Sequence, residues 1–526
     1  MSAPQVNMGN KPYSLHVAQV VGGGSVVNGM AFDRASAADY DSWEALGNPG
    51  WNWESMLKYF RKSTTFTPPS PEHAAEFNIT YDSKYYGTNG PIQVSYPKVE
   101  YQDQKKVWKS WYAENITFPR EHASGDAVGA YWIPNNIDPK EVRRSHARLA
   151  YYDPVSSRPN LKLLTGQTVN QILLEGKGKN LKAVGIQFVD RTTGEVQQAR
   201  ASREVILSAG GIFTPHLMQL SGLGPKTVLE AAGIPVKKDI PGVGSNLQDH
   251  PTISLRYNIS NLAFPNPTSL QTNATFNATS RAEYLANKTG FYGYAQRNTL
   301  AFLSLPQITP SKFRNLVSGL LSQNAVSFLP DIYKSTPALV RGFLAQRKVL
   351  ANDFLTNKLA IGEMPLAYTG TALSALQKPL SRGTVTLDPK NLQTPVIQFQ
   401  ALQNPFDLDI LLEMVSWQRR HWSSPLLSSY APVEIMPGAQ VTDPKEIFNR
   451  IVENGGVAPS FAHPSCTCAM MPEELGGVVD SELRVYGVKG LRIVDASVMP
   501  VIVAAHLQST VYAVAEKGAD IIRGRK

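Results

Sequence analysis

A short apolar run that ends in small residues constrains the fold of this 526-residue chain more than any other feature. Within REVILSAGG, Glu204–Ser208 has the apolar composition of a buried strand, and the helical stretch His216–Ser221 follows soon after it. Leu491–Val494 is a second short buried strand, and Ser509–Arg523 carries apolar residues at helical spacing. Strands alternating with helices in this way predict an α/β layer.

Further strands are expected at Leu161–Thr165, Val169–Leu174 and Ala183–Val189, whose residues are apolar and rich in β-branched side chains. Two stretches of different composition interrupt the α/β pattern. One is rich in Trp, Tyr, Pro and Asn, and the other combines many prolines with the β-like runs Gly383–Leu387 and Val396–Gln400. We therefore expect a discontinuous α/β domain at residues 1–45, 145–255 and 455–526, and one second domain assembled from residues 46–144 and 256–454.

The net charge of +9 does not indicate a nucleic-acid-binding protein. The densest basic cluster, Arg143, Arg144, His146 and Arg148, is only a few residues long and is typical of a solvated face. The chain carries no zinc-finger or other nucleic-acid module, and no apolar run approaches the roughly 18 residues that a membrane helix needs. The positive balance instead favours attraction of an anionic cofactor or substrate.

The chain has only two cysteines, Cys466 and Cys468, so it has no disulfide framework. On a strand the two would lie roughly 6.6 Å apart, near the upper limit that a disulfide spans. His463 precedes them, which suggests metal ligands and, as an alternative function, a zinc-dependent hydrolase. Zinc sites favour Cys-x-x-Cys with a second distant pair, and this sequence has none, so we expect free thiols and no metal.

Six Asn-x-Ser/Thr acceptors point to the secretory route and to a glycosylated surface loop, since four of them fall within thirty residues. They are Asn78, Asn115, Asn258, Asn273, Asn277 and Asn287. The first residues, MSAPQVNMGNKPYSLH, lack the basic-then-apolar pattern of a signal peptide. The protein would be secreted if a leader precedes this sequence, and cytoplasmic if the start is genuine.

Two glycine-rich segments have the composition of ligand-binding loops. Val20–Arg34 (VVGGGSVVNGMAFDR) leads into an expected helix, and its glycines allow the backbone to approach a ligand closely, where Ser25 and Asn28 could bind a polar ring edge. A plain tight turn is the simpler alternative. Gly210–Pro251 contains a strand–turn–helix followed by a long Pro/Gly-rich loop, and long structured loops are often functional.

Two histidines, His463 and His506, bracket much of the third segment, Phe461–Ile522. Each could be an ordinary structural histidine. As a pair, they are chemically suited to oxidising an alcohol, because one imidazole can take the hydroxyl proton while the other holds the oxygen. The hydride must then pass to a redox cofactor, since side chains cannot accept it.

All three segments, in this order and at this spacing, resemble the glucose–methanol–choline (GMC) oxidoreductases. The first is similar to that family's GGSS-x-x-NGM loop, the second to its T/S-P…S-G-L/I-G signature at Thr214–Gly224, and the third to its H-P-x-G-T-C-x-M and L-R-V-V-D-A-S-V-M-P runs. The stretches RSHARLAYYDP, RPNLKLLTGQTVNQIL and KPLSRGTVTL also match, so the resemblance covers essentially the whole chain. The ending with His506 and Gln508 looks most like the aryl-alcohol oxidase and glucose oxidase or dehydrogenase branch.

The resemblance implies a Rossmann-like FAD-binding domain with an interleaved α+β substrate domain built on an antiparallel sheet. It implies FAD as cofactor, oxidation of a primary or secondary alcohol to an aldehyde, ketone or lactone, and dioxygen or a quinone as electron acceptor. Aromatic and secondary-metabolite alcohols are the candidate substrates. His463 would be the base and His506 its partner at the flavin's reactive edge. The implied cofactor contacts are the flavin loop at Gly24, Ser25, Asn28 and Gly29, the adenine contact at Val169, and the diphosphate, ribityl and ring contacts at Asp495, Ala496, Gln508 and Ser509.

The sequence departs from the family in one large respect and two small ones. It contains no complete G-x-G-x-x-G, so the N-terminal βαβ unit that binds the diphosphate is expected to be missing. We expect a truncated sequence; a short form that binds FAD weakly, or a flavin-free non-catalytic protein, are the alternatives. In addition, Gln19–Val20 replaces the usual Gly-Lys, and Ser465–Cys466 stands where the family has a variable residue and glycine.

Overall fold

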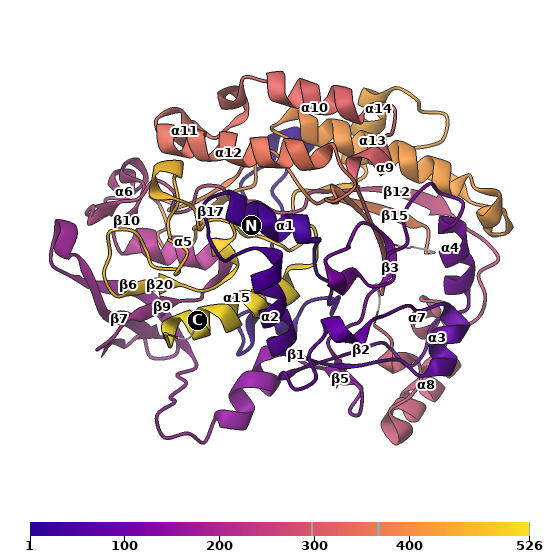
Figure 1. Ribbon diagram of the computed structural model, residues 1–526, viewed down its shortest axis with the longest axis horizontal. Helices are drawn as coiled ribbons and strands as arrows, with labels where there is room; N and C mark the ends of the chain where they lie inside the picture. Colours follow the sequence, from indigo (N-terminus) through magenta and orange to yellow (C-terminus); the bar gives the residue numbers. More distant parts are fainter. Residues whose placement is uncertain (296–297, 366–368, 525–526) are drawn as a thin grey trace.

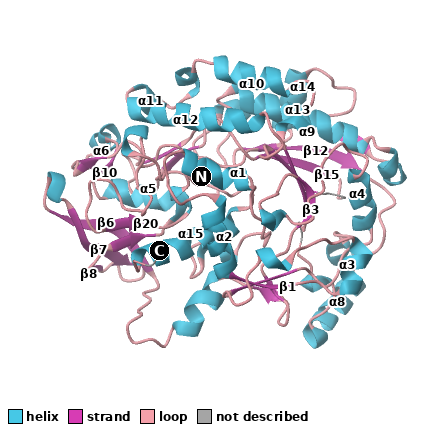
Figure 2. Cartoon of the chain, viewed as in Figure 1, coloured by secondary structure: helices cyan, strands magenta, loops and turns pink. Residues whose placement is uncertain are grey.

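The computed structural model describes residues 1–295, 298–365 and 369–524. In Figure 1 a layer of helices lies along the top, one group of strands lies to the left and another to the right, and α15 and α2 lie between them. Figure 2 shows the same division by secondary structure, with strands gathered in separate groups and helices covering them. The fold is therefore a layered combination of α and β elements, as the sequence predicts.

The left-hand group contains most of the predicted α/β elements. β9 (Val205–Leu207) pairs in parallel with β20 (Leu491–Ile493), and β9 leads into α5 (Gly210–Leu220). Beside them, β6 (Gln167–Glu175), β7 (Lys182–Asp190) and β8 (Val196–Arg200) form an antiparallel sheet. α15 (Leu507–Ile522) is the predicted C-terminal helix. These elements confirm the strand and helix predictions at their positions in the sequence.

One predicted strand, Leu161–Thr165, is absent. This segment forms a loop in which Leu161, Leu163 and Leu164 are 41%, 43% and 62% exposed. A strand needs a neighbouring strand to satisfy its backbone N–H and C=O groups. The described residues pair no strand with this segment, so its apolar, extended sequence remains a loop.

α2 (Trp53–Ser63) packs against α15 and shares its hydrophobic core. Met56 and Phe60 of α2 are buried in the same cluster as Leu207 and Ile493 of the parallel strands. The predicted division assigns residues 46–144 to the second domain. Packing instead groups α2 with the α/β elements, because its buried face is complementary to α15.

The right-hand group is the antiparallel sheet that the resemblance implies. Its strand order is β18-β12-β15-β14-β13-β3, with β19 also paired to β12. The strands are β3 (Gly129–Trp132), β12 (Thr252–Asn258), β13 (Thr299–Leu303), β14 (Gly362–Pro365), β15 (Thr371–Leu376), β18 (Val433–Met436) and β19 (Val457–Ala458). Both inserted stretches contribute to it, and the predicted boundary at 255/256 falls inside β12.

β13 shows how this sheet divides the interior. Its residues alternate between two cores: Ala301 and Leu303 pack toward the helical layer, whereas Leu300 and Phe302 pack with Ala504 on the opposite face. Successive side chains of a strand point to opposite faces, and all five residues of β13 are buried. The second face turns toward the segments that carry the histidines.

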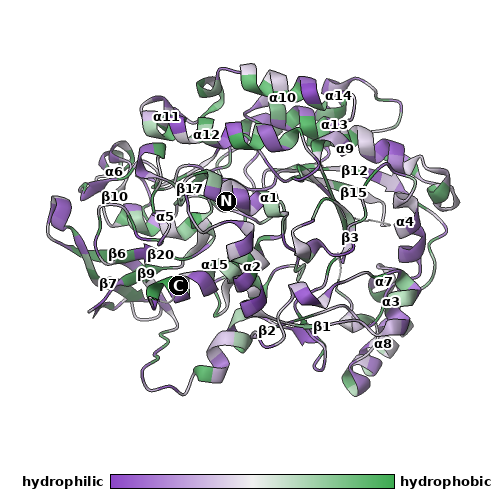
Figure 3. Cartoon of the chain, viewed as in Figure 1, coloured by the Kyte–Doolittle hydropathy of each residue, from purple (hydrophilic) through white to green (hydrophobic). Residues whose placement is uncertain are grey.

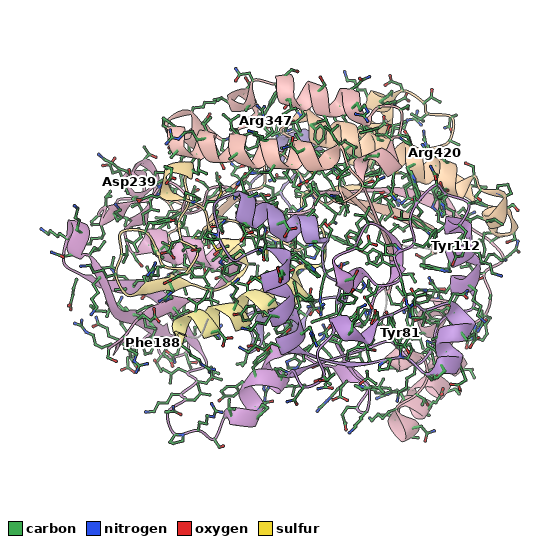
Figure 4. All side chains as sticks on the ribbon, viewed as in Figure 1. Tyr81, Tyr112, Phe188, Asp239, Arg347 and Arg420 are labelled. Atoms are coloured by element: carbon green, nitrogen blue, oxygen red, sulfur yellow. The ribbon has the colours of Figure 1, made fainter. Side chains whose placement is uncertain are left out.

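The helical layer covers the other face of the sheet. It contains α9 (Leu305–Ile308), α10 (Phe313–Ser322), α11 (Asp331–Lys334), α12 (Pro337–Phe354), α13 (Pro405–Trp422) and α14 (Pro444–Glu453). Three of these helices begin with a proline, whose fixed φ suits the first turn. Figure 3 shows hydrophilic and hydrophobic residues side by side along these helices, and Figure 4 shows side chains filling the space beneath them, with Arg347 and Arg420 labelled on this layer.

The remaining helices and strands complete the described secondary structure, and the helix that carries Tyr40 and Trp43 is central, since both side chains are fully buried. The helices are α1 (Ala37–Ala45), α3 (Pro71–Phe77), α4 (Asp103–Trp111), α6 (Lys226–Ala231), α7 (Ser269–Thr272) and α8 (Ala274–Asn287). The strands are β1 (Thr64–Thr67), β2 (Ile92–Ser95), β4 (Ile137–Asp138), β5 (Arg143–Arg144), β10 (Leu223–Gly224), β11 (Lys238–Asp239), β16 (Thr384–Thr386) and β17 (Val396–Gln398). β16 and β17 confirm two predicted strands. Across the described ranges, every helix is too short or too polar to cross a membrane.

Candidate active site

The three sequence segments singled out above meet in the folded chain. The first joins the third where Gln508 Nε2 donates to Ala31 O at 2.6 Å. The second joins the third where Asp495 Oδ2 accepts from the backbone N–H of Gly210 at 2.9 Å and from Thr214 Oγ1 at 2.6 Å. Segments separated by hundreds of residues therefore build one site.

His463 and His506 lie together at this meeting point. Their ring centroids are 5.5 Å apart and their planes are nearly perpendicular, at 88°. Phe461 contacts both rings, with centroid distances of 5.5 Å to His463 and 6.1 Å to His506. A third imidazole completes the cluster: His250 Nδ1 lies 2.9 Å from His463 Nδ1.

Two buried carboxylates flank the His506 ring. Asp33 Oδ1 is 3.1 Å from His506 Nδ1, and Asp33 Oδ2 accepts the His506 backbone N–H at 3.2 Å. On the other side, Glu363 Oε1 lies 3.8 Å from His506 Nε2, while its Oε2 accepts from Gln377 Nε2 at 2.8 Å. Glu363 reaches the site because it is paired opposite Phe302 and so shares that face of the sheet.

The His463 loop is held by a different carboxylate, Asp249. One of its oxygens, Oδ1, accepts the backbone N–H of Phe461 at 2.9 Å and that of His463 at 3.2 Å. The other, Oδ2, accepts from Ser460 Oγ at 2.6 Å. The neighbouring His250 backbone N–H also donates to Oδ1. Asp249 thus bonds the backbone of His463, and the adjacent His250 contacts its ring.

The two aspartates respond differently to burial. Burial alone would raise the pKa of Asp33, but the charge of His506 and its hydrogen bond hold that pKa below its ordinary value. Burial raises the pKa of Asp249 to about 7, because the hydrogen bonds from its neutral donors only partly oppose desolvation. For His250, burial and then the adjacent His463 imidazole hold the pKa well below its ordinary value, so the ring is neutral.

The glycine loop of the first segment lies beside the histidine cluster. It forms a short 3₁₀ turn, Gly23–Val26, rather than leading directly into the expected helix, because Gly22 and Gly23 have positive φ values of 107° and 55°. A Cβ added at Gly23, Gly24 or Gly29 would meet no atom within 4 Å. The backbone of Gly24 and Gly29 therefore borders open space, as a loop that contacts a ligand requires.

Ser25 and Asn28 use much of their hydrogen-bonding capacity within the protein. Ser25 Oγ donates to Gly22 O at 2.6 Å and accepts the Ala147 N–H at 3.1 Å. Asn28 Oδ1 accepts from Arg144 Nη1 at 2.6 Å, and its Nδ2 donates to Gln508 Oε1 at 2.8 Å. These contacts fix the loop, so the two side chains hold its backbone in place.

The other predicted contact residues divide into buried and accessible ones. Asp495 is 7% exposed and fastens the N-terminus of α5, and the Ser509 hydroxyl donates to Asp33 O. Ala496 and Gln508 are half-buried. Val169 lies on β6 with 37% of its surface exposed. Whether these residues contact a cofactor stays a prediction.

Cys466 and Cys468 are free and fully buried, and burial raises the pKa of both thiols, that of Cys466 to about 12. Within the described residues, no cluster of three or more His, Cys, Asp or Glu side chains is arranged to hold a metal ion. Cys466 has φ = 71°, which explains why the resembling family has glycine here. The cysteine occupies a left-handed position that normally favours glycine.

Sequence reasoning misses four residues that the structure places in the site: Asp33, Asp249, His250 and Glu363. Asp33 follows the glycine loop within AFDR, and His250 ends the PGVGSNLQDH stretch, so both lie in segments that the sequence marks as functional. Glu363 carries no local signal, because only the pairing of β13 with β14 brings it to His506.

Comparisons with known proteins identify the family of the chain. Residues 5–252 match the amino-terminal model of the GMC oxidoreductases and residues 379–515 the carboxy-terminal model. The chain belongs to the GMC oxidoreductase family. The resemblance of the sequence to GMC proteins is confirmed, and so is the predicted fold class of a cofactor domain with a substrate domain on an antiparallel sheet.

Individual GMC relatives cover nearly the whole chain. Dehydrogenase xptC from Emericella nidulans is 36% identical, over 99% of this chain and 83% of that protein. Among solved structures, an FAD-dependent oxidoreductase from Chaetomium thermophilum is 40% identical with a TM-score of 0.95, covering 99% of this chain and 89% of that one. A fungal aryl-alcohol oxidase is 36% identical with a TM-score of 0.94, covering 99% and 88%. These neighbours support FAD as the cofactor.

The residues present fit the ring end of FAD. Open space borders Gly23, Gly24 and Gly29, and these glycines lie on the same loop as Ala31, which is hydrogen-bonded to Gln508 beside the histidines. A flat ring system can approach only a backbone without Cβ atoms in its path. The loop, Gln508 and the two imidazoles would hold the ring, and FAD would supply a hydride acceptor there.

Proposed function

We propose that this GMC oxidoreductase catalyses FAD-dependent oxidation of an alcohol, with His463 as the general base and His506 as its partner. The observation that carries the proposal is the pair of nearly perpendicular imidazoles, 5.5 Å apart, where the three family segments meet. Two imidazoles at this separation can both approach one substrate oxygen. This arrangement suits proton removal from a carbinol group.

The chain's own residues supply the proton chemistry. His463 accepts the hydroxyl proton of the substrate, and His506 holds the substrate oxygen in line. Asp33 fixes the orientation of His506 through the ring and the backbone N–H together. FAD, when bound, would accept the hydride from the carbinol carbon, so that the CH–OH group loses one proton and one hydride and becomes C=O.

The proposed substrate is a primary or secondary alcohol, with aromatic and secondary-metabolite alcohols as the first to test. Two findings support this class. One similar structure is a fungal aryl-alcohol oxidase and one relative is a fungal dehydrogenase. Phe461 also contacts both histidine rings, which places an aromatic face next to the reacting group. Dioxygen or a quinone is the proposed electron acceptor.

The first experiment is an absorption spectrum of the purified chain with and without added FAD. Flavin bands at near-equimolar occupancy support the proposal and allow substrate screening with an oxygen electrode and a quinone dye. A colourless protein that added FAD cannot reconstitute favours the alternative, a flavin-free and non-catalytic GMC protein.

The second experiment tests the base in the FAD-loaded protein. Replacing His463 with alanine should lower kcat at least about 10²-fold with the flavin still bound, because a positioned general base contributes about that much. His216→Ala is the control, since His216 is a buried histidine outside the site whose Nε2 is bonded to Leu392 O. Near-normal turnover of His463→Ala would refute the assignment of the base.

We also propose that the protein is a secreted glycoprotein. Five of the six acceptor asparagines are exposed, and the sixth, Asn277, is half-buried with its Nδ2 donating to Leu270 O at 2.6 Å. Expression behind a signal peptide in a fungal host, followed by deglycosylation and peptide mass spectrometry, tests this. Glycans are expected at the exposed sites and least at Asn277; an unmodified secreted protein contradicts the proposal.

A further inference from the structure

We propose that the buried ion pair between Lys378 and Asp39 positions His506, and that it acts through the backbone of the loop just before that histidine. This inference rests on the proposed role of His506 as the residue that holds the substrate oxygen. It assigns a function to two charged residues that the proposed mechanism does not otherwise use.

The loop at residues 500–505 is buried along its whole length, and none of its residues belongs to a helix or a strand. Its backbone N–H and C=O groups cannot reach water, so they need partners within the protein. The loop leads directly into His506, and α15 begins at the next residue, Leu507. The partners of this loop, together with Asp33, therefore fix the position of His506.

Side chains from distant segments supply the partners of the first half of the loop. Trp43 Nε1 donates to Val501 O at 2.9 Å, Gln346 Nε2 donates to Pro500 O at 3.0 Å, and Gln248 Oε1 accepts the Ile502 N–H at 3.3 Å. Each of these bonds joins a side chain to the backbone of the loop. The loop is thus held in place by side chains rather than by its own secondary structure.

The ion pair holds the half of the loop that is nearest to His506. Lys378 Nζ donates to Ile502 O. Asp39 Oδ1 accepts the Ala504 N–H at 2.9 Å. Asp39 lies in the first turn of α1, one helical turn before Trp43, so α1 presents both side chains to the loop on one face. The same two residues therefore bind each other and two backbone groups of the loop.

The burial of this pair indicates what its charges do. Both side chains are fully buried, and Asp39 Oδ2 also accepts from Ser36 Oγ at 2.7 Å. Taking two charges out of water is costly, and apolar side chains of similar volume often give equal or greater stability. An apolar pair, however, could neither donate to Ile502 O nor accept the Ala504 N–H. The charges thus serve the backbone of the loop.

The residue before Lys378 acts on the surroundings of His506 from another direction. Gln377 Nε2 donates to Glu363 Oε2 at 2.8 Å, and Glu363 Oε1 lies 3.8 Å from His506 Nε2. Two consecutive residues just after β15 therefore support His506, one through the loop before it and the other through a carboxylate beside its ring. A group that holds a substrate oxygen in line must be accurately placed, so loss of this support should slow the reaction.

The test removes both charges together. Lys378→Met keeps the unbranched stem but cannot donate to Ile502 O, whereas Asp39→Asn keeps an oxygen for the Ala504 N–H. Each single variant leaves a buried charge without its partner and should lower the urea midpoint. The double variant Asp39→Asn/Lys378→Met contains no such charge and should regain most of the lost stability. It therefore separates the position of His506 from the stability of the fold.

The matched control is the ion pair between Arg419 and Glu434, which lies outside the site and is also largely buried. Arg419 resembles Lys378 in that it also donates to a backbone carbonyl, that of Val441, at 2.9 Å. Arg419→Met/Glu434→Gln removes these charges in the same way. This control should leave the rate of flavin reduction and KM unchanged.

The kinetic test uses FAD-loaded protein, with flavin content measured first. The double variant at 39 and 378 should lower the rate of flavin reduction about 10-fold or more, with KM changed less than about threefold. In a His506→Ala background, the same two substitutions should change the rate less than about twofold, because the ring that they position is already absent. A wild-type rate in the double variant, or the same loss in both backgrounds, overturns the inference.

A measurement independent of turnover is amide hydrogen exchange of the purified chain, with or without FAD. In the double variant, the amides of Ala504 and His506 should exchange about 10-fold faster or more, while those of α13 keep their protection. Unchanged exchange of these two amides also overturns the inference. Near-normal turnover of His463→Ala, or failure to bind FAD, would instead refute the proposed function, and the exchange result would still show whether the ion pair holds the loop.

Discussion

The His506 side of the site and the His463 side each rest on a buried aspartate, but the pKa values of the two aspartates are shifted in opposite directions. Asp33 bonds the His506 ring directly, and its pKa lies below the ordinary value. Asp249 bonds backbone N–H groups and a hydroxyl around His463, and burial raises its pKa to about 7. A partner that can carry positive charge keeps a buried carboxylate ionised, whereas neutral donors do so only in part.

The difference gives the two imidazoles different surroundings. His506 is flanked by Asp33 and Glu363, which suits a ring that carries or shares a positive charge beside a substrate oxygen. His463 instead faces His250, whose Nδ1 lies 2.9 Å from its own Nδ1 and whose pKa burial holds well below the ordinary value. In the proposed mechanism, these different surroundings belong to different tasks: His506 holds the substrate oxygen and His463 removes the proton.

The largest expected effect comes from removing the charge on the His506 side. Asp33→Asn should lower kcat/KM by about 10²-fold or more and destabilise the fold by about 3–5 kcal/mol, because it leaves a buried partner without its counter-charge. Steady-state kinetics and urea unfolding measure both. Asp41→Asn is the control, since Asp41 is exposed and its Oδ1 accepts the Trp53 N–H outside the site. A loss below 10-fold would show that the charge of Asp33 is unimportant for catalysis.

The second prediction concerns Asp249, on the His463 side, and the pH dependence of the free energy of unfolding. The folded protein binds a proton at Asp249 more tightly than the unfolded chain does, since its pKa rises from 3.8 to about 7. Its contribution to stability therefore falls as pH rises from about 4 to about 7, by up to roughly 4 kcal/mol. Relative to wild type, Asp249→Asn should gain stability across this window in urea unfolding. Parallel curves for the two proteins would contradict the raised pKa.

A smaller effect is expected at the second carboxylate of the His506 side. Glu363→Gln keeps the hydrogen-bonding shape beside Gln377 but removes a charge 3.8 Å from His506 Nε2. Losing one charge at this distance should lower kcat/KM about 10-fold, less than Asp33→Asn, since no short bond to the ring is broken. An effect larger than that of Asp33→Asn would reverse the proposed ranking of the two carboxylates.

The smallest effect concerns the loop that follows His463. Cys466 has φ = 71°, and glycine adopts this region without the steric cost that a Cβ brings. Cys466→Gly should change the free energy of unfolding by less than about 1 kcal/mol, because relief of strain offsets the loss of a buried side chain. Thermal unfolding checks this, with Cys468→Gly as a control that gains no such relief. A loss above 2 kcal/mol for Cys466→Gly would show that the thiol's packing dominates.

The sequence predicts a strand of this fold correctly where a strand-like segment also has a neighbouring strand to pair with. Val205–Leu207 and Leu491–Ile493 form the expected strands because each has the other to pair with. Leu161–Thr165 has an equally strand-like sequence but remains a loop, because the ladder partner that it needs is not among the described residues. Strand propensity alone does not decide the outcome; the neighbouring strand does.

For the site, the sequence predicts the two histidines, which lie near turn signals. It misses the residues that contact these histidines in the folded chain. His463 and His506 stand beside small residues and can be identified directly. Glu363 lies in the middle of a buried strand and comes to His506 only through the sheet register. Likewise, His250 and His463 are 213 positions apart in the chain, and nothing local signals that their rings touch.

The parallel pair β9–β20 has a consequence for handling the protein. The outer edge of β20 is hydrogen-bonded to residues 483–485, whereas no described strand pairs with the outer edge of β9, where Ile206 is 43% exposed. Outer strand edges with apolar side chains are templates for pairing with other chains. Concentrated solutions of this chain should therefore form soluble oligomers by intermolecular strand addition, at a rate that rises with concentration. A charged substitution such as Ile206→Lys would slow the growth of scattered light and keep the protein monodisperse long enough for the flavin experiments.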